Sequence, residues 1–181
     1  VFLSRISRKK NVRFFIDTLK RCRGPLIADI YGPVEDAAYW EECREAMAAA
    51  PDGVTITYRG ALKPEQVRGT LCGYDLFFLP TLGENFGHVV LEAMQAGLPV
   101  LLSDKTPWRD LQRHGVGADL PLADPEAFVG YIEGMQMMTA SQRNELRQRV
   151  LAFSENASAR NFTIESHQKM FNLKNKNNHI V

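Results

Sequence analysis

The stretch DLFFLPTLGENFGHVVLEAMQAGLPVLLS, residues 75–103, decides the fold. It begins and ends with short apolar runs, 75–79 and 99–103, in which polar and apolar residues do not alternate. Such runs are typical of central strands of a parallel sheet, because both faces of those strands are buried. Between the runs, apolar residues surround a predicted helix over 86–96, which we therefore expect to be buried. This strand–helix–strand unit indicates a parallel α/β sheet.

The same alternation continues along the rest of the chain. Short apolar runs predict strands, and amphipathic stretches between them predict helices. The expected strands cover 1–5, 26–31, 53–59, 75–79, 99–103 and, more weakly, 117–122. The expected helices cover 11–23, 35–49, 64–72, 86–96, 107–113, 125–138, 141–153 and 158–171. Connections this short predict parallel strands with helices on both faces of the sheet.

The composition of the 181-residue chain is ordinary for a globular domain, with 45% apolar residues, 24% charged residues and a net charge of +1. So balanced a charge argues against a dedicated nucleic-acid binder. No run approaches the ~18 apolar residues of a membrane span, and no signal peptide is visible. Cys22, Cys43 and Cys72 form no C-x-x-C pair, and we expect them to be buried, reduced thiols of a cytosolic protein.

The small net charge hides an asymmetry. Residues 1–25 carry eight basic side chains and one acidic one, a sum of +7, which leaves −6 for the other 156 residues. Either a specific anion or an acidic partner binds this basic segment, or it is a solvated surface. The chain opens on an apolar run without an initial Met, so we expect it to be part of a longer protein.

Candidate binding residues lie in the loops after the strands, because ligands of parallel sheets bind at the carboxyl ends of the strands. Glu84 falls in the loop after 75–79, and Glu92 lies eight residues later in the predicted helix. The start of that helix, beside 85–87, offers free N–H groups and a positive dipole end that suit a phosphate. Arg5 and Lys10, after the first strand, suit a diphosphate.

Each candidate also has a plainer interpretation. Glu84 fits a surface loop, and Glu92 fits a narrow solvent-facing side of its helix. His88, in the first helical turn, would face a ligand, whereas the other three histidines fit the surface. The sequence holds no G-x-S-x-G, H-E-x-x-H or G-K-[ST] phosphate motif and no acid pair with metal-ligand spacing, so we expect no metal site.

Residues 83–100 resemble the E-x7-E segment of the group 1 family of retaining glycosyltransferases, with Glu84 and Glu92 as the two acids. Further elements follow the family's order: Ser4-Arg5 with Lys10, Ile30-Tyr31-Gly32-Pro33, Tyr58-Arg59-Gly60 and Asp75–Pro80. The resemblance implies an α/β, Rossmann-like domain of three αβα layers with a parallel sheet of about six strands. Such a domain would be the C-terminal, donor-binding half of a two-domain GT-B enzyme.

The resemblance also implies what these residues bind. Glu84 would be the catalytic residue, because it would meet hydroxyls of the transferred sugar near the reacting carbon. The remaining donor contacts would come from Arg5, Lys10, Asn85, Phe86 and Gly87 to the diphosphate, Glu92 to the ribose, Arg59 and Gly60 to the base, and Gly32, His88 and Val89 along the walls. No tightly bound cofactor and no metal are implied, since Arg, Lys and the helix dipole would stabilise the leaving diphosphate.

The resemblance covers most of the chain, so it predicts a donor domain over 1–171 and a disordered tail over 172–181. The partners implied are a nucleotide-diphosphate sugar and an acceptor glycan, lipid or small molecule, the acceptor bound by an N-terminal domain that is not in this chain. Sugar transfer would retain configuration, and the isolated chain would be inactive. The implied location is the cytoplasm, or the periphery of the inner membrane, in a bacterial type of polysaccharide or glycoconjugate synthesis.

Other functions fit the same pattern. A nucleotide-sugar epimerase or a phosphorylase shares the GT-B fold, and a non-enzymatic α/β module would use the basic N-terminal segment to bind an acidic partner. The sequence also departs from the family. Ser4 stands where Gly is usual, Lys9 where an acid is frequent, and 104–110 replaces a Gly-rich stretch. Trp108 and Arg109, in that last segment, either shape the acceptor side or simply pack.

Overall fold

The computed structural model describes residues 1–157, so the expected helix over 158–171 and the expected tail over 172–181 lie outside the described residues. The strands are β1 (Phe2–Leu3), β2 (Leu26–Tyr31), β3 (Val54–Gly60), β4 (Phe77–Leu79), β5 (Val100–Ser103) and β6 (Gly117–Leu120). The helices are η1 (Arg8–Lys10), α1 (Val12–Leu19), α2 (Ala37–Ala48), α3 (Pro64–Leu71), α4 (His88–Gln95), α5 (Leu111–His114) and α6 (Pro125–Gln136). A further helix covers 140–157.

The six strands are all parallel and form two three-stranded sheets, β1-β2-β3 and β4-β5-β6. The two sheets meet where β1 lies beside β4. There the Val1 nitrogen donates to the Leu76 carbonyl at 2.7 Å, and the Phe78 amide donates to the Val1 carbonyl at 2.9 Å. The spatial order is therefore β3-β2-β1-β4-β5-β6. From β1 the strand order runs outward to β3 on one side of the sheet, and from β4 it runs outward to β6 on the other side. Parallel sheets bind ligands at such a switch point, here between β1 and β4.

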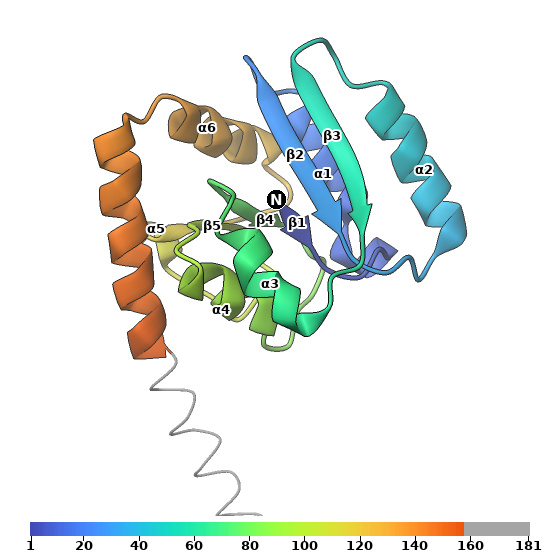
Figure 1. Cartoon of the computed structure of the whole chain (residues 1–181). Helices are drawn as coiled ribbons and strands as arrows, with labels where there is room; N and C mark the ends of the chain where they lie inside the picture. Colours follow the sequence, from blue (N-terminus) through green and yellow to red (C-terminus); the bar gives the residue numbers. More distant parts are fainter. Residues whose placement is uncertain (158–181) are drawn as a thin grey trace, which may run out of the picture.

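Helices cover the sheet in two layers, which confirms the three-layer α/β architecture. Helix α1 contacts both α2 and α6, and α3 contacts α4. Figure 1 shows α1 behind β2 and β3, with α3 and α4 in front of the sheet. The rear layer packs through aromatic rings: the centroid of Phe128 on α6 lies 5.1 Å from that of Phe14 on α1 and 5.6 Å from that of Phe78 on β4.

Three expectations from the sequence were wrong in detail. The helix expected over 107–113 begins only at Leu111, because Thr106 and Trp108 form a turn and Asp110 has a left-handed backbone, with φ 58°. Helix α4 is not buried on all sides, since His88, Glu92 and Gln95 are exposed on one face. Finally, Cys72 is exposed.

The other two cysteines are buried as expected. Burial raises the pKa of the Cys22 and Cys43 thiols to about 11, so both stay protonated and unreactive at neutral pH.

Glycine at position 32 allows the loops after β1 and β2 to approach each other. The Ser4 amide donates to the Tyr31 carbonyl at 3.1 Å, and the Ile6 amide donates to the Pro33 carbonyl at 2.8 Å. Gly32 sits between these bonds with φ +141°, and a Cβ there would lie 1.8 Å from the Ser4 carbonyl oxygen. No side chain fits this space, so the backbone near Arg5 keeps its position only with Gly32.

We predict that Gly32→Ala destabilises the protein much more than Gly60→Ala. Gly60 also has a positive φ, +80°, but a Cβ there would meet nothing within 4 Å. We expect Gly60→Ala to cost only the backbone strain, ~1–2 kcal/mol. Gly32→Ala adds the clash with Ser4, for roughly 1–3 kcal/mol more. Urea unfolding measures both losses, and equal values for the two variants would contradict the close packing at Gly32.

Candidate functional site

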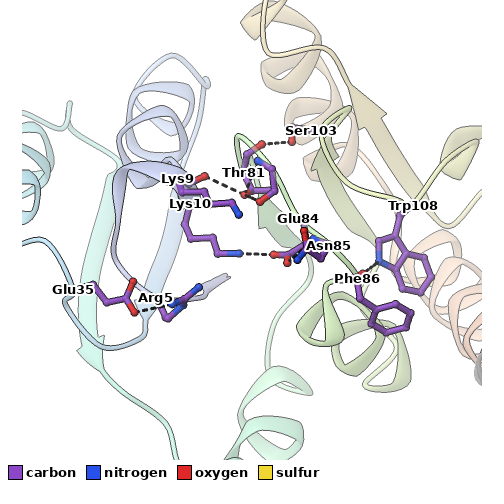
Figure 2. A network of polar contacts seen from close by, with 11 residues as sticks. Arg5, Lys9, Lys10, Glu35, Thr81, Glu84, Asn85, Phe86, Ser103 and Trp108 are labelled. Atoms are coloured by element: carbon purple, nitrogen blue, oxygen red, sulfur yellow. Dashed lines mark hydrogen bonds and ion pairs between the residues drawn. The ribbon is translucent and has the colours of Figure 1, made fainter. Parts of the chain in front are cut away.

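The site centres on an ion pair between Lys10 and Glu84. Lys10 ends η1, directly after β1, and Glu84 lies in the loop after β4, as the sequence predicted. The Lys10 Nζ contacts Glu84 Oε2, and the two side chains are only 7% and 16% exposed (Figure 2). A buried ammonium is costly unless an acid compensates it. The pair therefore holds together two loops that are 74 residues apart.

Thr81 holds the backbone of these two loops in place. It is fully buried, and its hydroxyl accepts from the Gly83 amide at 3.3 Å. Two acceptors lie within reach of the hydroxyl as a donor, the Lys9 carbonyl at 3.1 Å and the Gly83 carbonyl at 3.0 Å. The Leu82 amide also donates to the Lys9 carbonyl, at 2.8 Å. Since Lys9 precedes Lys10, Thr81 fixes the distance across which Lys10 meets Glu84.

The segment after β5 supports the same loop from its other side. The Ser103 hydroxyl donates to the Thr81 carbonyl, and the Glu84 amide donates to the Lys105 carbonyl at 3.1 Å. The indole Nε1 of Trp108 donates to the Phe86 carbonyl at 2.9 Å (Figure 2). Three loops, after β1, β4 and β5, thus form one polar network around Glu84.

The start of α4 lies beside the ion pair. Gly87 is the N-cap, with φ +75°, and no side chain caps the helix. The first amides of a helix have no partner inside it, and the dipole makes this end positive. The Asn85 amide already donates to Glu84 Oε1 at 3.1 Å. Of the three predicted residues, Asn85 thus has its amide engaged by Glu84, and the Gly87 amide lies at the positive end of the helix, where an anion fits.

A cleft of ≈ 260 Å³ adjoins this centre. It contains four of the predicted residues, Arg5, Gly32, Val89 and Glu92. Its walls come from the loops after β1 and β2 on one side and from α3 and α4 on the other; the lining residues are Leu3, Ser4, Arg5, Gly32, Pro33, Leu62, Val67, Val89 and Glu92. Glu92 thus lies on an exposed helix face that borders a cleft, which removes the expected cost of burying it.

The remaining predicted residues have more open surroundings. Arg5 pairs with Glu35 at 2.9 Å, and both side chains are largely exposed, at 59% and 42%. Arg59 pairs with the buried Asp29 at 3.0 Å, which draws its side chain onto β2. The His88 ring is exposed and lies 4.5 Å from that of Phe86, centroid to centroid.

Asp29 also accepts a hydrogen bond from the Tyr74 hydroxyl at 2.6 Å. Burial and the hydrogen bond to this carboxylate raise the pKa of Tyr74. Both carboxylate oxygens of Asp29 therefore have a donor, one from Arg59 and the other from Tyr74.

Acids from other elements neutralise much of the basic N-terminal segment. Arg13 pairs with Asp17, the one acid of the segment. Four other basic residues pair with acids from elsewhere in the chain: Arg8 with Asp36 and Glu42, Arg5 with Glu35, Lys10 with Glu84, and Arg21 with Glu126. Among residues 1–157, only Lys9, Lys20 and Arg23 of the eight basic residues have no ion-pair partner. This pairing disfavours a module that binds an acidic partner through the whole segment.

Two searches for other kinds of site found nothing in the described part of the chain. No three His, Cys, Asp or Glu side chains within residues 1–157 are grouped so that they would hold a metal ion. Among the helices of the same residues, none combines the length and apolarity that crossing a membrane requires.

The sequence missed two residues of this site, Thr81 and Ser103. Both are small and polar, and each lies where a strand passes into its loop, so nothing in the pattern marked their side chains as buried. Trp108 stood out only as a departure from the family's Gly-rich stretch.

A family model described as "Glycosyl transferases group 1" matches residues 1–136. No curated protein sequence matches the chain.

Solved structures share the fold at low identity. Anabaena Alr3699/HepE in complex with UDP is 20% identical, with a TM-score of 0.75, over 93% of this chain and 48% of that one. The same protein in complex with UDP-glucose is 21% identical, with a TM-score of 0.73, over 86% and 43%. The catalytic domain of cholesterol-alpha-glucosyltransferase from Helicobacter pylori is 13% identical, with a TM-score of 0.68, over 86% and 97%. The chain thus spans less than half of the Anabaena protein and nearly all of the Helicobacter domain.

We predict that Thr81→Val destabilises the protein more than Thr81→Ser does. Valine keeps the shape of threonine but leaves the Gly83 amide and the Lys9 carbonyl without the hydroxyl, a loss of ~1–3 kcal/mol. Serine keeps the hydroxyl and loses one methyl group, ~0.8 kcal/mol. Urea unfolding gives the free energies, and hydrogen exchange at the Gly83 amide should accelerate only in the valine variant. Similar exchange in both variants would show that the hydroxyl does not hold this loop.

Proposed function

The chain belongs to the group 1 glycosyltransferase family, and we propose that it is a donor-binding domain, which holds a nucleotide-diphosphate sugar in the cleft beside Lys10 and Glu84. One observation carries the proposal: a buried lysine and a loop glutamate meet beside the start of α4, where the strand order reverses. A phosphate-binding cation, an acceptor for sugar hydroxyls and a positive helix end are thus within one site.

In this proposal the diphosphate lies between the loop after β1 and the start of α4. Lys10 supplies a charge with little competing water, so its interaction with an anion is strong. The pair of Arg5 and Glu35 is exposed, and the guanidinium exchanges that partner for phosphate oxygens at little cost. The amide groups at the start of α4 complete the site. These groups would stabilise the charge that develops on the leaving diphosphate, so the proposed reaction needs no metal or tightly bound cofactor.

The rest of the donor extends from this point in two directions. The transferred sugar lies against Glu84, whose carboxylate accepts hydrogen bonds from sugar hydroxyls. The nucleoside lies along the cleft, with Glu92 at the ribose and the backbone of Arg59 and Gly60 at the base. Gly60 suits that role, because no heavy atom lies within 4 Å of the position that a Cβ would take.

The complete activity requires more than this domain. We propose that residues 1–171 bind the donor and that a separate N-terminal domain binds the acceptor, a glycan, lipid or small molecule. Transfer with retention of configuration and a cytoplasmic or peripheral inner-membrane location are parts of the same proposal. The chain alone would bind the donor weakly and transfer little or no sugar.

Calorimetric titration of the chain with UDP, GDP and ADP tests the proposal. UDP is the first probe because the Anabaena structures hold UDP and UDP-glucose. We expect weak binding of at least one nucleotide. Arg5→Ala should weaken the nucleoside diphosphate by roughly fivefold and leave the nucleoside unchanged, since only the phosphates carry charge. No binding of any nucleotide at millimolar concentration to a folded sample would refute the proposal, and equal losses for nucleotide and nucleoside would remove Arg5 from the phosphate site.

A second prediction concerns the ion pair itself. Glu84 competes with phosphate for the buried Lys10 ammonium. Glu84→Gln should therefore destabilise the free protein by about 3–5 kcal/mol, because the cation loses its partner. The same variant should bind UDP roughly fivefold more tightly, because a phosphate then supplies the missing negative charge. The same variant should lose any preference for UDP-glucose over UDP, because its amide accepts sugar hydroxyls less well than a carboxylate. Calorimetry with both ligands measures the two effects on binding. Weaker UDP binding by Glu84→Gln would show that Glu84 does not compete for Lys10.

A further inference from the structure

We propose that Trp108 is a positioning residue that aims the Gly87 amide at the donor diphosphate; this inference rests on the proposed function. Trp108 belongs to the segment after β5 that replaces the family's usual Gly-rich stretch. It does not line the cleft. Its effect would pass through one peptide unit, the bond between Phe86 and Gly87.

The geometry follows from the planarity of that peptide. The Trp108 Nε1 donates to the Phe86 carbonyl at 2.9 Å, so this carbonyl points toward the indole. Residues 1–157 contain no cis peptide bond. In a trans peptide the N–H points opposite to the C=O, so the Gly87 N–H points away from Trp108. Figure 2 shows Lys10 and Trp108 on opposite sides of Glu84 and Asn85. Since the Gly87 N–H points away from Trp108, the proposal places it toward the side of Lys10.

The hydrogen bond has a second effect. A donor at the carbonyl oxygen polarises the peptide, and the N–H of the same unit becomes a better donor to an anion. Gly87 is also the N-cap of α4, where the helix dipole is most positive. Trp108 therefore acts on the direction and the strength of this one amide.

Other contacts hold the indole in this place. The Trp108 amide donates to the Thr106 hydroxyl at 3.3 Å, in a turn that precedes α5. A Cβ on Gly87 would lie 3.4 Å from the indole nitrogen and 3.1 Å from the Glu84 Cγ. The ring thus packs closely against Gly87, with its nitrogen at hydrogen-bonding distance from the Phe86 carbonyl.

Trp108→Phe tests this inference, because phenylalanine keeps an aromatic ring and removes the N–H. Trp40→Phe is the matched control: it makes the same change at the other tryptophan, whose ring packs on Tyr58 with centroids 4.6 Å apart. The probes are UDP and uridine, titrated into each variant and followed by calorimetry and by the NMR signal of the Gly87 amide. Thermal unfolding shows whether each variant is folded.

We expect Trp108→Phe to bind UDP roughly 3- to 10-fold more weakly, which is the worth of one hydrogen bond. Uridine binding should not change, and the shift of the Gly87 amide on adding UDP should shrink. Trp40→Phe should match the wild type in all three. Unchanged UDP affinity in Trp108→Phe, or equal losses for UDP and uridine, would overturn the positioning role of Trp108 and leave the proposed donor-binding function standing. No UDP binding by the wild type would instead refute the proposed function.

Discussion

The burial of one ammonium group, that of Lys10, sets the arrangement of the site. A buried cation needs an acid, and Glu84 is the acid that reaches it. This requirement fixes the loop after β4 relative to the loop after β1, and all other contacts of the site follow from that relation. Thr81 holds the backbone behind the pair, while Ser103 and Trp108 extend the support to the loop after β5. A pair of opposite charges at the end of two central strands thus organises three loops.

The topology of the sheet makes this meeting possible. Strands β1 and β4 are far apart in sequence but lie side by side, joined by the backbone bonds of Val1 and Phe78. All strands run the same way, so their carboxyl ends share one edge, and the loops of the two halves meet there. Gly32 brings the loop after β2 close to the same point because it has no side chain. The pairing of β1 with β4 therefore determines both how the core packs and which site loops meet at the carboxyl ends of the strands.

The sequence predicted the strands and the site loops well, for a physical reason. Central parallel strands are buried on both faces and read as unbroken apolar runs, so the runs at 75–79 and 99–103 located β4 and β5. Lys10 and Glu84 were both candidates, yet their contact depends on which strands are neighbours, and residue spacing does not give that. The roles of Thr81 and Trp108 depend on contacts across loops, which have no periodicity. For the same reason the helix expected over 107–113 was placed too early: the Trp108 amide donates to the Thr106 hydroxyl in a turn, and the Trp108 indole donates to the Phe86 carbonyl just before α4.

The charge balance of the chain has a structural meaning that the total of +1 conceals. Most basic side chains near the N-terminus pair with acids of other elements, among them Asp36 and Glu42 beside and on α2. These exposed pairs contribute little stability, but they remove free positive charge from the surface. Lys10 differs from these residues because its pair with Glu84 is buried, where salt screens charges less. In the proposed donor site it is therefore this one buried cation, rather than the summed charge of the N-terminal segment, that would bind the diphosphate.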